Sequence, residues 1–320
     1  MAAKRTERGS TDLAVIIVSW NVRDLVLEAL ASLFRDLSGS GLRARVMVVD
    51  SASGDGTVQA IHDAFPQVEV FAETENIGFV RGNNLALRKL GLDRPLAAQD
   101  EPAAIYLLNP DTITQPGATR ALLNALFSER NIGLVGANLT YVDGGFQHGA
   151  FAFPGLRQLW AEFYPTPGRW IEGRFNGRYP QSEYQGTHPF AVDFVLGAAM
   201  MLRADAIRDV GLLDEGFVMY CEEVDWAWRL RRAGWGARCV PQARVVHLAG
   251  QSSGQARPQA LTHLWTSRLR LYDAYYRAPK RWVARRMVRA GISRLERRAM
   301  SEHAPEDLIA AYKRIREMAS

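Results

Sequence analysis

The sequence is poor in cysteine and has no long apolar run. Cys221 and Cys239 are the only cysteines among 320 residues, which excludes a disulfide framework and a cysteine zinc site and is typical of a reducing cytoplasm. The apolar run from Leu13 to Trp20 is far shorter than the roughly 20 residues of a membrane-spanning helix. We therefore expect neither a signal peptide nor a transmembrane helix, and the run predicts a first buried strand.

Glycine-rich phosphate loops are also missing. The sequence contains no Gly-x-x-x-x-Gly-Lys-Ser/Thr segment, and no Gly-x-Gly-x-x-Gly follows a predicted strand. A nucleotide bound here would lack the usual glycine cradle. A divalent cation held by a carboxylate is another way to neutralise a diphosphate.

Acidic residues are scarce in one segment. Residues 256–300 hold twelve Lys and Arg but two acids, so the rest of the chain is near −5 although the whole carries +5. Aromatic residues lie among these cations, which favours contact with an anionic membrane surface. The alternative is an ordinary helix packed on the body with a solvated basic face. No nucleic-acid recognition motif accompanies the charge, so we expect no nucleic-acid partner.

Apolar runs and helical periods alternate along the chain, which predicts an α/β fold with a mostly parallel sheet flanked by helices. We expect a disordered segment 1–12, one domain over 13–253 and a helical extension over 254–320. The predicted strands are 13–18, 45–50, 68–71, 105–108, 132–137, 192–201, 237–240 and 244–247, with a hairpin at 141–146. The predicted helices are 25–34, 58–65, 80–90, 118–127, 204–210 and 222–233, and 154–190 is expected to be irregular.

Polar side chains follow three of the predicted strands. They are Ser19 and Asn21 after the first strand, Asp50 and Ser51 after the second, and Asn109 and Asp111 after the fourth. Ligands of open α/β sheets bind beyond the carboxyl ends of the strands. A helix-capping turn explains any one of these residues, but the set predicts a site. Asp111, held by Pro110, is suited to bind Mg²⁺ or Mn²⁺; capping of the next helix is the alternative.

A second acidic cluster begins the helix predicted at 222–233. Glu222, Glu223 and Asp225 suit a helix start, where the dipole favours negative charge. Helical spacing predicts Glu222 and Asp225 on one side and Glu223 elsewhere. We expect Trp226 and Trp228 to form apolar walls that raise a carboxylate pKa toward that of a general base.

A single histidine ends the last predicted strand. His247, in the segment ARVVHLAG, follows a strand near a proline, as Asp111 does. It is either a metal ligand or a packed histidine, and the residues alone leave both open.

These motifs together resemble those of family 2 glycosyltransferases, in particular the rhamnosyltransferase-like branch that acts on cell-surface polysaccharides. The resemblance runs from about Leu13 to Ser253 and rests on VIIVSWN, VMVVDSASGDGT, ENIGFVRGNN, YLLNPDT, VGLLDEGFVMYCEEVDWAWRLRRAGW and VPQARVVHLAGQSS. It implies the GT-A fold, a single nucleotide-sugar-binding α/β domain, and transfer with inversion at the anomeric carbon.

The resemblance also implies roles for individual residues. Asp111 matches the last acid of the family's Asp-x-Asp motif and would bind Mg²⁺ or Mn²⁺, and His247 matches a histidine that touches the metal in some relatives. Glu223 would be the catalytic base, with Glu222 and Asp225 shaping the acceptor pocket or orienting the base. Asp50, with Ser19 and Asn21 close by, would contact the base and ribose of the donor nucleotide. Asn76, Gly78 and Arg81 would line the floor near the ribose and diphosphate, and Ser51 and Asn109 are also expected to bind the donor.

Two positions depart from the family pattern. Asn109 replaces the first acid of Asp-x-Asp, in an Asn-Pro-Asp form that recurs among the rhamnosyltransferase-like members. Glu223 stands where an aspartate is usual, and its extra methylene moves the carboxylate by about an ångström, enough to affect catalysis about a hundredfold. Glu222 and Asp225 therefore stay open as alternative bases.

Two other functions compete with glycosyl transfer. A sugar-nucleotide nucleotidyltransferase would show a glycine-rich basic loop after the first strand, and VSWNVRDL has neither feature. A non-catalytic nucleotide-sugar-binding protein would not need Asp111, Glu223 and His247. We expect a nucleoside-diphosphate sugar, with rhamnose as one candidate, as donor, and a saccharide or polyprenyl-linked acceptor. The expected location is the cytoplasm or the inner face of the cell membrane; donor base, acceptor identity and oligomeric state stay open.

Overall fold

The structure is a computed structural model that describes residues 12–94, 101–248 and 257–320. The predicted disordered segment 1–12 lies outside the described residues except for Asp12. The predicted boundary between residues 253 and 254 also lies outside them.

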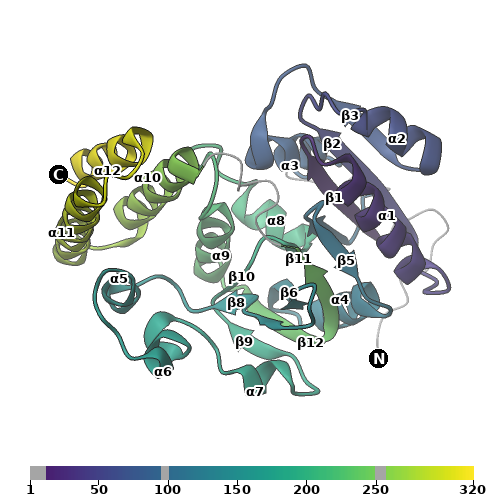
Figure 1. Cartoon of the computed structure of the whole chain (residues 1–320). Coiled ribbons are helices and arrows are strands. Elements are labelled where there is room, and N and C mark those ends of the chain that lie inside the picture. The colour runs from purple at the N-terminus through teal and green to yellow at the C-terminus, as the bar shows by residue number, and fades with distance from the viewer. Residues whose placement is uncertain (1–11, 95–100, 249–256) are drawn as a thin grey trace.

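One mixed sheet forms the centre of the molecule, with strand order β3-β2-β1-β4-β11-β6-β12-β5 (Figure 1). Strands β3, β2, β1 and β4 are parallel, β12 is parallel to β6, and β11 is antiparallel between β4 and β6. Their bounds are β1 Leu13–Ser19, β2 Ala44–Asp50, β3 Glu69–Ala72, β4 Ala104–Leu108, β5 Thr112–Thr114, β6 Ile132–Thr140, β11 Ala199–Arg203 and β12 Gly236–His247. The predicted α/β class is confirmed, and the first four strands begin and end within one residue of the prediction.

Helices cover both faces of this sheet, which explains why its central strands are apolar throughout. Alternate residues of β1 pack into two separate cores. One core lies under α1 Arg23–Leu37, α2 Thr57–Ala64 and α4 Ala118–Leu126, and the other under α3 Gly78–Lys89, α8 Ala204–Val210 and α9 Glu222–Arg232. Helix α3 lies close over β1 because Gly82 has no side chain; a Cβ there would sit 2.9 Å from Val18.

Several elements differ from the prediction. The segment expected to be irregular contains α5 Leu156–Phe163, α6 Gly168–Ile171, a 3₁₀ turn Arg174–Asn176 and α7 Gln181–Tyr184, which are too short to show a helical period. The extended stretch 192–201 is divided among β9 Phe190–Val192, β10 Phe194–Val195 and β11. The two short strands predicted near residue 240 form one strand, β12, with a register shift between Val240 and Arg244. Pro241 lies there and has no backbone N–H to donate to a partner strand.

The predicted hairpin is confirmed: β7 Phe146–Gln147 pairs antiparallel with the end of β6. A separate two-stranded sheet pairs β8 Ala150–Phe151 with β10.

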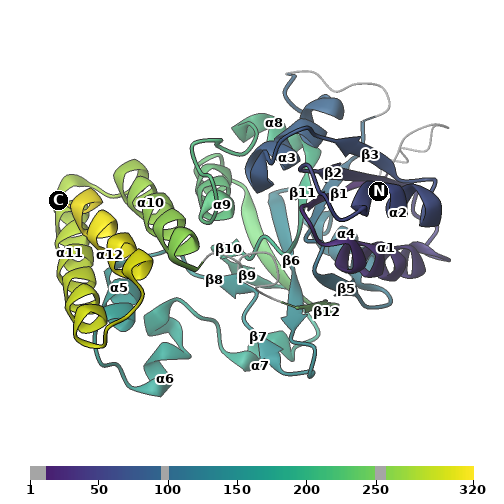
Figure 2. The same cartoon turned by 45° about the horizontal axis from the view of Figure 1, so that its top comes forward.

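Three helices, α10 Arg257–Tyr275, α11 Ala278–Ser301 and α12 Glu306–Met318, form a bundle at one end of the molecule (Figure 2). Their core includes Leu159 of α5. Tyr272, Tyr276 and Val288 are buried, so these apolar residues of the basic segment pack inward, as the alternative of an ordinary packed helix predicts. Among the described residues, no helix is both long and apolar enough to cross a bilayer.

Candidate active site

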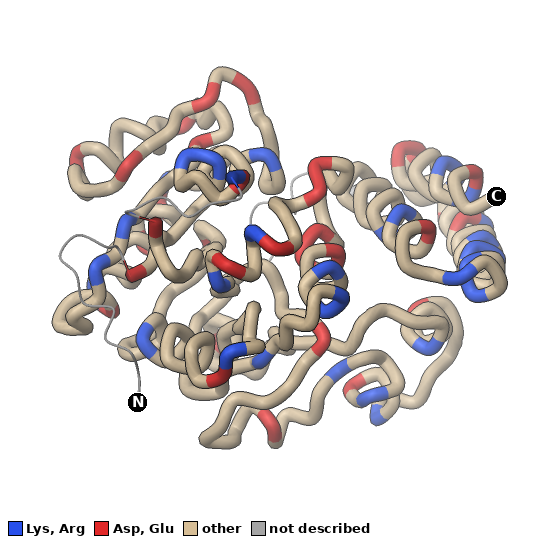
Figure 3. Tube along the Cα trace, turned by 180° about the vertical axis from the view of Figure 1, so that it is seen from behind, with Lys and Arg blue, Asp and Glu red and all other residues tan. Residues whose placement is uncertain are grey.

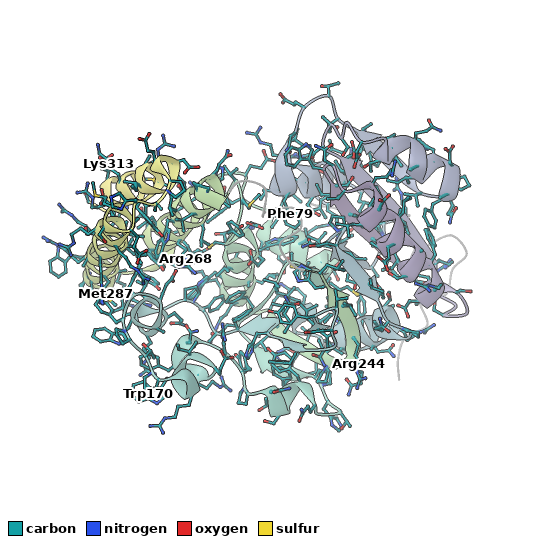
Figure 4. The ribbon with its side chains drawn as sticks, in the orientation of Figure 1. Phe79, Trp170, Arg244, Arg268, Met287 and Lys313 are labelled. Carbon is teal, nitrogen blue, oxygen red and sulfur yellow. The ribbon has the colours of Figure 1, made fainter. Side chains whose placement is uncertain are left out.

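A cavity of about 410 Å³ lies at the carboxyl ends of β1 and β4. Successive strands run outward from β1 on one side and continue from β4 on the other, and such a reversal of strand order is where open α/β sheets bind ligands. The cavity is lined by the end of β1, the turn after β4, the start of α3, the start of α9 and the end of β12. Phe79, at the start of α3, lies near the middle of the molecule (Figure 4).

Asp111 and His247 are neighbours on this cavity because β5 pairs with β12. Thr112 is opposite His247 in the register, and the N–H of Leu248 donates to the carbonyl oxygen of Asp111 at 2.9 Å. Asp111 is 5% exposed and His247 is 8% exposed. Asp111 Oδ1 lies 3.6 Å from His247 Nε2. Two residues 136 positions apart in sequence therefore face each other, and both are almost fully buried.

The ring of His247 is oriented by Gln147 of β7. His247 Nδ1 lies 3.2 Å from Gln147 Oε1, and an amide oxygen only accepts, so we assign the proton to Nδ1. Burial lowers the pKa of His247, although Asp111 raises it in part. The unprotonated Nε2 then faces a carboxylate, and these two electron-pair donors fit a divalent cation.

The ends of β1 and β2 meet as predicted, but Asp50 lies beneath the cavity wall. The parallel register places Ser19 beside Asp50, whose carboxylate accepts from Ser19 Oγ at 3.0 Å, Ser53 N–H at 2.8 Å and Ser53 Oγ at 2.6 Å. Ser19 and Ser51 line the cavity, while Asp50 is one hydrogen bond away. Asn21, with φ 51°, lies outside the cavity lining and bonds to the loop after β2 at Ser53 and Gly54.

The remaining residues predicted to bind the donor do not all line the cavity. Asn76 and Gly78 line the cavity, and Asn76 Oδ1 accepts from the Gly78 N–H at 3.0 Å. Gly78 has φ +73°, which favours glycine there. Asn109 also lines the cavity, whereas Arg81 is outside its lining and lies 3.9 Å from Glu215.

The acids of α9 are arranged differently from the prediction. Glu222 and Glu223 both line the cavity, whereas Asp225 accepts from Arg229 Nε at 2.8 Å and from the Tyr275 hydroxyl at 2.6 Å. The predicted grouping of Glu222 with Asp225 does not describe the cavity, which is lined by Glu222 and Glu223. The cavity lies beyond the N-terminal end of α9, so two adjacent residues of the first turn reach it, and the third acid, deeper in the helix, faces α10.

The apolar walls around these acids also differ from the prediction. Trp226 donates from Nε1 to the Gly211 carbonyl at 2.9 Å, and Trp228 stacks on Phe153 and Tyr275. Neither tryptophan lines the cavity. The apolar lining near the acids comes instead from Phe79, Leu196, Met219 and Tyr220.

Burial perturbs both cavity carboxyls. It raises the pKa of Glu223 to about 7, and burial together with the neighbouring Glu223 raises the pKa of Glu222 well above its usual value. Oε2 of each side chain is buried without a hydrogen-bond partner. A carboxyl that titrates near neutral pH in a cavity is able to act as a general base.

Comparison with known proteins identifies the family. Residues 14–211 match the family described as glycosyl transferase family 2. The chain belongs to glycosyl transferase family 2. The predicted resemblance to this family is thus confirmed.

Two curated relatives of this family 2 glycosyltransferase carry specific names. It is 29% identical, over 275 residues, to N-acetylglucosaminyl-diphospho-decaprenol L-rhamnosyltransferase of Mycobacterium tuberculosis, covering 80% of this chain and 87% of the relative. It is 25% identical, over 69% of this chain and 62% of the relative, to low-salt glycan biosynthesis hexosyltransferase Agl10 of Haloferax volcanii.

Solved structures share the GT-A fold with this family 2 glycosyltransferase. GalNAc-T7 with UDP, GalNAc and Mn²⁺ aligns with a TM-score of 0.60 at 15% identity, over 97% of this chain and 55% of that one. Mannosyltransferase PcManGT from Pyrobaculum calidifontis with GDP-Man and Mn²⁺ aligns with a TM-score of 0.54 at 15% identity, over 98% and 85%. The predicted GT-A fold is confirmed.

Sequence reasoning missed several cavity residues of this glycosyltransferase. Gln147 contacts His247 from a strand 100 positions away, and no local pattern marks that pairing. Met219 and Tyr220 line the cavity in the loop before α9. Tyr220 and Cys221 have positive φ values of 67° and 65°. Such a left-handed turn is uncommon for these residue types, so the sequence does not predict it.

The buried acid Glu222 should weaken the fold at alkaline pH. An acid with a raised native pKa binds its proton more tightly when folded, so stability falls as pH rises from the unfolded pKa through the native one. We expect Glu222→Gln to raise the melting temperature by about 2–4 °C at pH 8, and by less at pH 5. Thermal unfolding at both pH values checks this, with exposed Glu183→Gln as control. An equal shift at both pH values would contradict the assignment.

Proposed function

We propose that this family 2 glycosyltransferase moves a hexosyl group, with inversion, from a nucleoside-diphosphate sugar to an acceptor hydroxyl. The observation that carries the proposal is that Glu223, with its raised pKa, shares one cavity with the facing pair Asp111 and His247. A base and a candidate cation site in one cavity are what displacement of a nucleoside diphosphate requires.

In this proposal, Asp111 and His247 hold Mg²⁺ or Mn²⁺, which would act as a Lewis acid on the donor diphosphate. Only these two side chains are assigned to the cation, so the diphosphate oxygens supply further ligands. Asn109, which stands in place of a second acid, lines the same cavity. Two of the similar structures contain Mn²⁺ with a nucleotide, which supports a divalent cation in this cavity.

The nucleotide part of the donor is held by residues at the carboxyl ends of β1 and β2 and at the start of α3. Ser19, Ser51, Asn76 and Gly78 line the cavity and would contact the nucleotide. Asp50 and Asn21 act through these neighbours, because their own side chains are bonded to Ser19, Ser53 and Gly54. Arg81 would reach the donor only by leaving Glu215.

Glu223 removes the proton from the acceptor hydroxyl while that oxygen attacks the anomeric carbon. The bond to the diphosphate breaks on the opposite face of the sugar, and the proton stays on the Glu223 carboxyl. Burial and the charge of Glu223 raise the pKa of Glu222, so Glu222 keeps its proton while Glu223 titrates. Asp225 positions α9 through Arg229 and Tyr275 and does not reach the cavity.

The name of one relative supports a proposal for the donor sugar and the acceptor. The Mycobacterium tuberculosis relative is named for L-rhamnose and for an N-acetylglucosaminyl-diphospho-decaprenol. We therefore propose rhamnose or a related hexose as the transferred sugar and a polyprenyl-linked or free saccharide of cell-surface polysaccharide synthesis as the acceptor.

A panel of nucleotide sugars tests the proposal. The protein is incubated with each donor and Mn²⁺, with or without EDTA, and release of nucleoside diphosphate is measured. We expect one donor to be turned over, and EDTA to stop the turnover. Binding of a donor without any hydrolysis or transfer would favour a non-catalytic nucleotide-sugar-binding protein.

The pH dependence tests Glu223 separately. A base must be deprotonated to act, so the rate should rise with pH through about 7, where burial places the pKa of Glu223, and level off above it. The kcat/KM profile between pH 5 and pH 9 checks this. A rate that is flat between pH 5.5 and pH 8 would contradict a base with this pKa.

A further inference from the structure

The bundle end of the molecule presents a basic surface along α11. Helix α11 contains one acid, Glu296, and that acid pairs with Arg316 of α12 at 2.8 Å. Seen from behind, blue segments gather on this helix at the right of the molecule (Figure 3). The cations of α11 are therefore not neutralised along their own helix.

Five exposed side chains of α11 form one stripe along the helix. Trp282, Arg286, Arg289, Arg297 and Met300 are exposed and follow steps of four, three, eight and three residues, which keep them on one side of a helix. The opposite side is occupied: Ala284, Val288 and Ile292 are buried in the bundle core. The stripe therefore faces away from the bundle core.

The cations of this face lack anionic partners. Throughout the described part of the chain, no carboxylate pairs with Arg286, Arg289, Arg294 or Arg297. Arg286 lies over the Trp282 ring at 5.2 Å. By contrast, Arg281 and Arg285 pair with Asp273, and Arg298 pairs with Glu302.

Two exposed tryptophans outside the stripe lie at the same end of the molecule. Trp160 of α5 is 48% exposed and Trp170 of α6 is 46% exposed, and Trp282 within the stripe is 61% exposed. Helix α5 packs on α11, where Phe163 lies against Gly291, and Trp170 lies at the outer end of α6 (Figure 4). Both ribbon views place α5, α6 and α11 at the end opposite α2 and β3.

We propose that the α11 stripe, which carries Trp282 among its arginines, docks this glycosyltransferase on an anionic lipid bilayer. Unpaired arginines attract anionic headgroups, and tryptophan rings are suited to the headgroup level of a membrane. The apolar side of α11 is used by the bundle, so the protein sits on the surface and does not insert this helix. The phosphate backbone of a nucleic acid would also attract the arginines, and oligonucleotide binding is therefore one of the measured outcomes.

This inference goes beyond the proposed transfer and needs no catalytic activity. The test is sedimentation of the full chain with vesicles of phosphatidylglycerol and phosphatidylcholine, with pure phosphatidylcholine vesicles in parallel. We expect binding to the anionic vesicles at low salt and a large loss at about 1 M salt, where the Debye length falls to about 3 Å. Equal binding to both vesicle types, or none to either at low salt, would overturn the proposal.

Substitutions locate the surface. Each basic residue near an anionic bilayer contributes about fivefold to binding, so the triple variant Arg286→Gln, Arg289→Gln, Arg297→Gln should bind about a hundredfold more weakly. The matched control changes three exposed arginines of the α/β domain, Arg94, Arg120 and Arg130, to glutamine and should keep its binding. The variant Trp282→Ala should lose the salt-resistant part of binding. A triple variant that binds like wild type would sink the inference.

Two further measurements separate the alternatives. Transfer to a water-soluble acceptor should be unchanged in the triple variant, so loss of docking is distinguished from loss of the proposed reaction. Binding of single-stranded or duplex oligonucleotides more tightly than anionic vesicles, abolished by the same three substitutions, would assign the surface to nucleic acid and overturn the bilayer proposal.

Discussion

Asp111→Ala is expected to lower kcat/KM by about a thousandfold. A Lewis-acid cation contributes several kcal/mol to such a step, and each 1.36 kcal/mol corresponds to tenfold in rate. Asp111 is buried beside His247, and within the described residues no N–H or O–H group donates to its carboxylate in competition with a cation. Steady-state kinetics measure the effect, and calorimetric titration of nucleoside diphosphate with Mn²⁺ should show that binding is lost as well.

The control for Asp111→Ala is an exposed acid of the hairpin, Asp143→Ala, which should leave both quantities unchanged. His247→Ala should show a smaller loss than Asp111→Ala, because a neutral imidazole contributes no charge to the cation. If Asp111→Ala retained activity within about tenfold of the wild type, Asp111 would not hold the cation.

Glu223→Gln is expected to reduce kcat by about 10²–10⁴-fold, the usual contribution of a general base. The amide has nearly the same shape but cannot accept the acceptor's proton. Donor binding should be unchanged, since Glu223 is assigned to the acceptor side. Single-turnover kinetics measure the loss, and the rise of rate with pH near 7 should disappear with it.

Two neighbouring acids provide the comparison for Glu223→Gln. Asp225→Asn changes a residue bonded to Arg229 and Tyr275 outside the cavity, so its effect should be smaller. Glu222 keeps its proton while Glu223 titrates, because burial and the charge of Glu223 raise its pKa, so Glu222→Gln should leave the rise of rate near pH 7 in place. The base assignment fails if Glu222→Gln, and not Glu223→Gln, eliminates turnover.

The fold was predictable because its signals are local. The continuous apolar runs of β1, β2 and β4 indicate strands buried on both faces, and the polar residues after them mark the edge where ligands bind. Parallel register then brings Ser19 and Asp50 together without further information. Asp111 was found for the same reason, since it directly follows β4.

The parts that sequence did not predict depend on contacts between distant segments. Gln147 orients His247 across 100 residues, and β11 inserts antiparallel between β4 and β6 after a long excursion. The helical period predicts which acids of α9 share a side of the helix. It does not predict which of them reach the cavity, because that depends on where the cavity meets the end of the helix. Since the cavity lies beyond that end, Glu222 and Glu223 reach it and Asp225 does not.

A structure with bound nucleoside diphosphate and Mn²⁺ tests the central claim most directly. The account predicts the diphosphate in the cavity between β1 and β4, with the ion bonded to Asp111 and His247 and with Glu223 facing the anomeric side of the donor. A nucleotide bound elsewhere, such as in the cavity beside Arg231 and Trp235, with Asp111 touching neither ion nor phosphate, would contradict it.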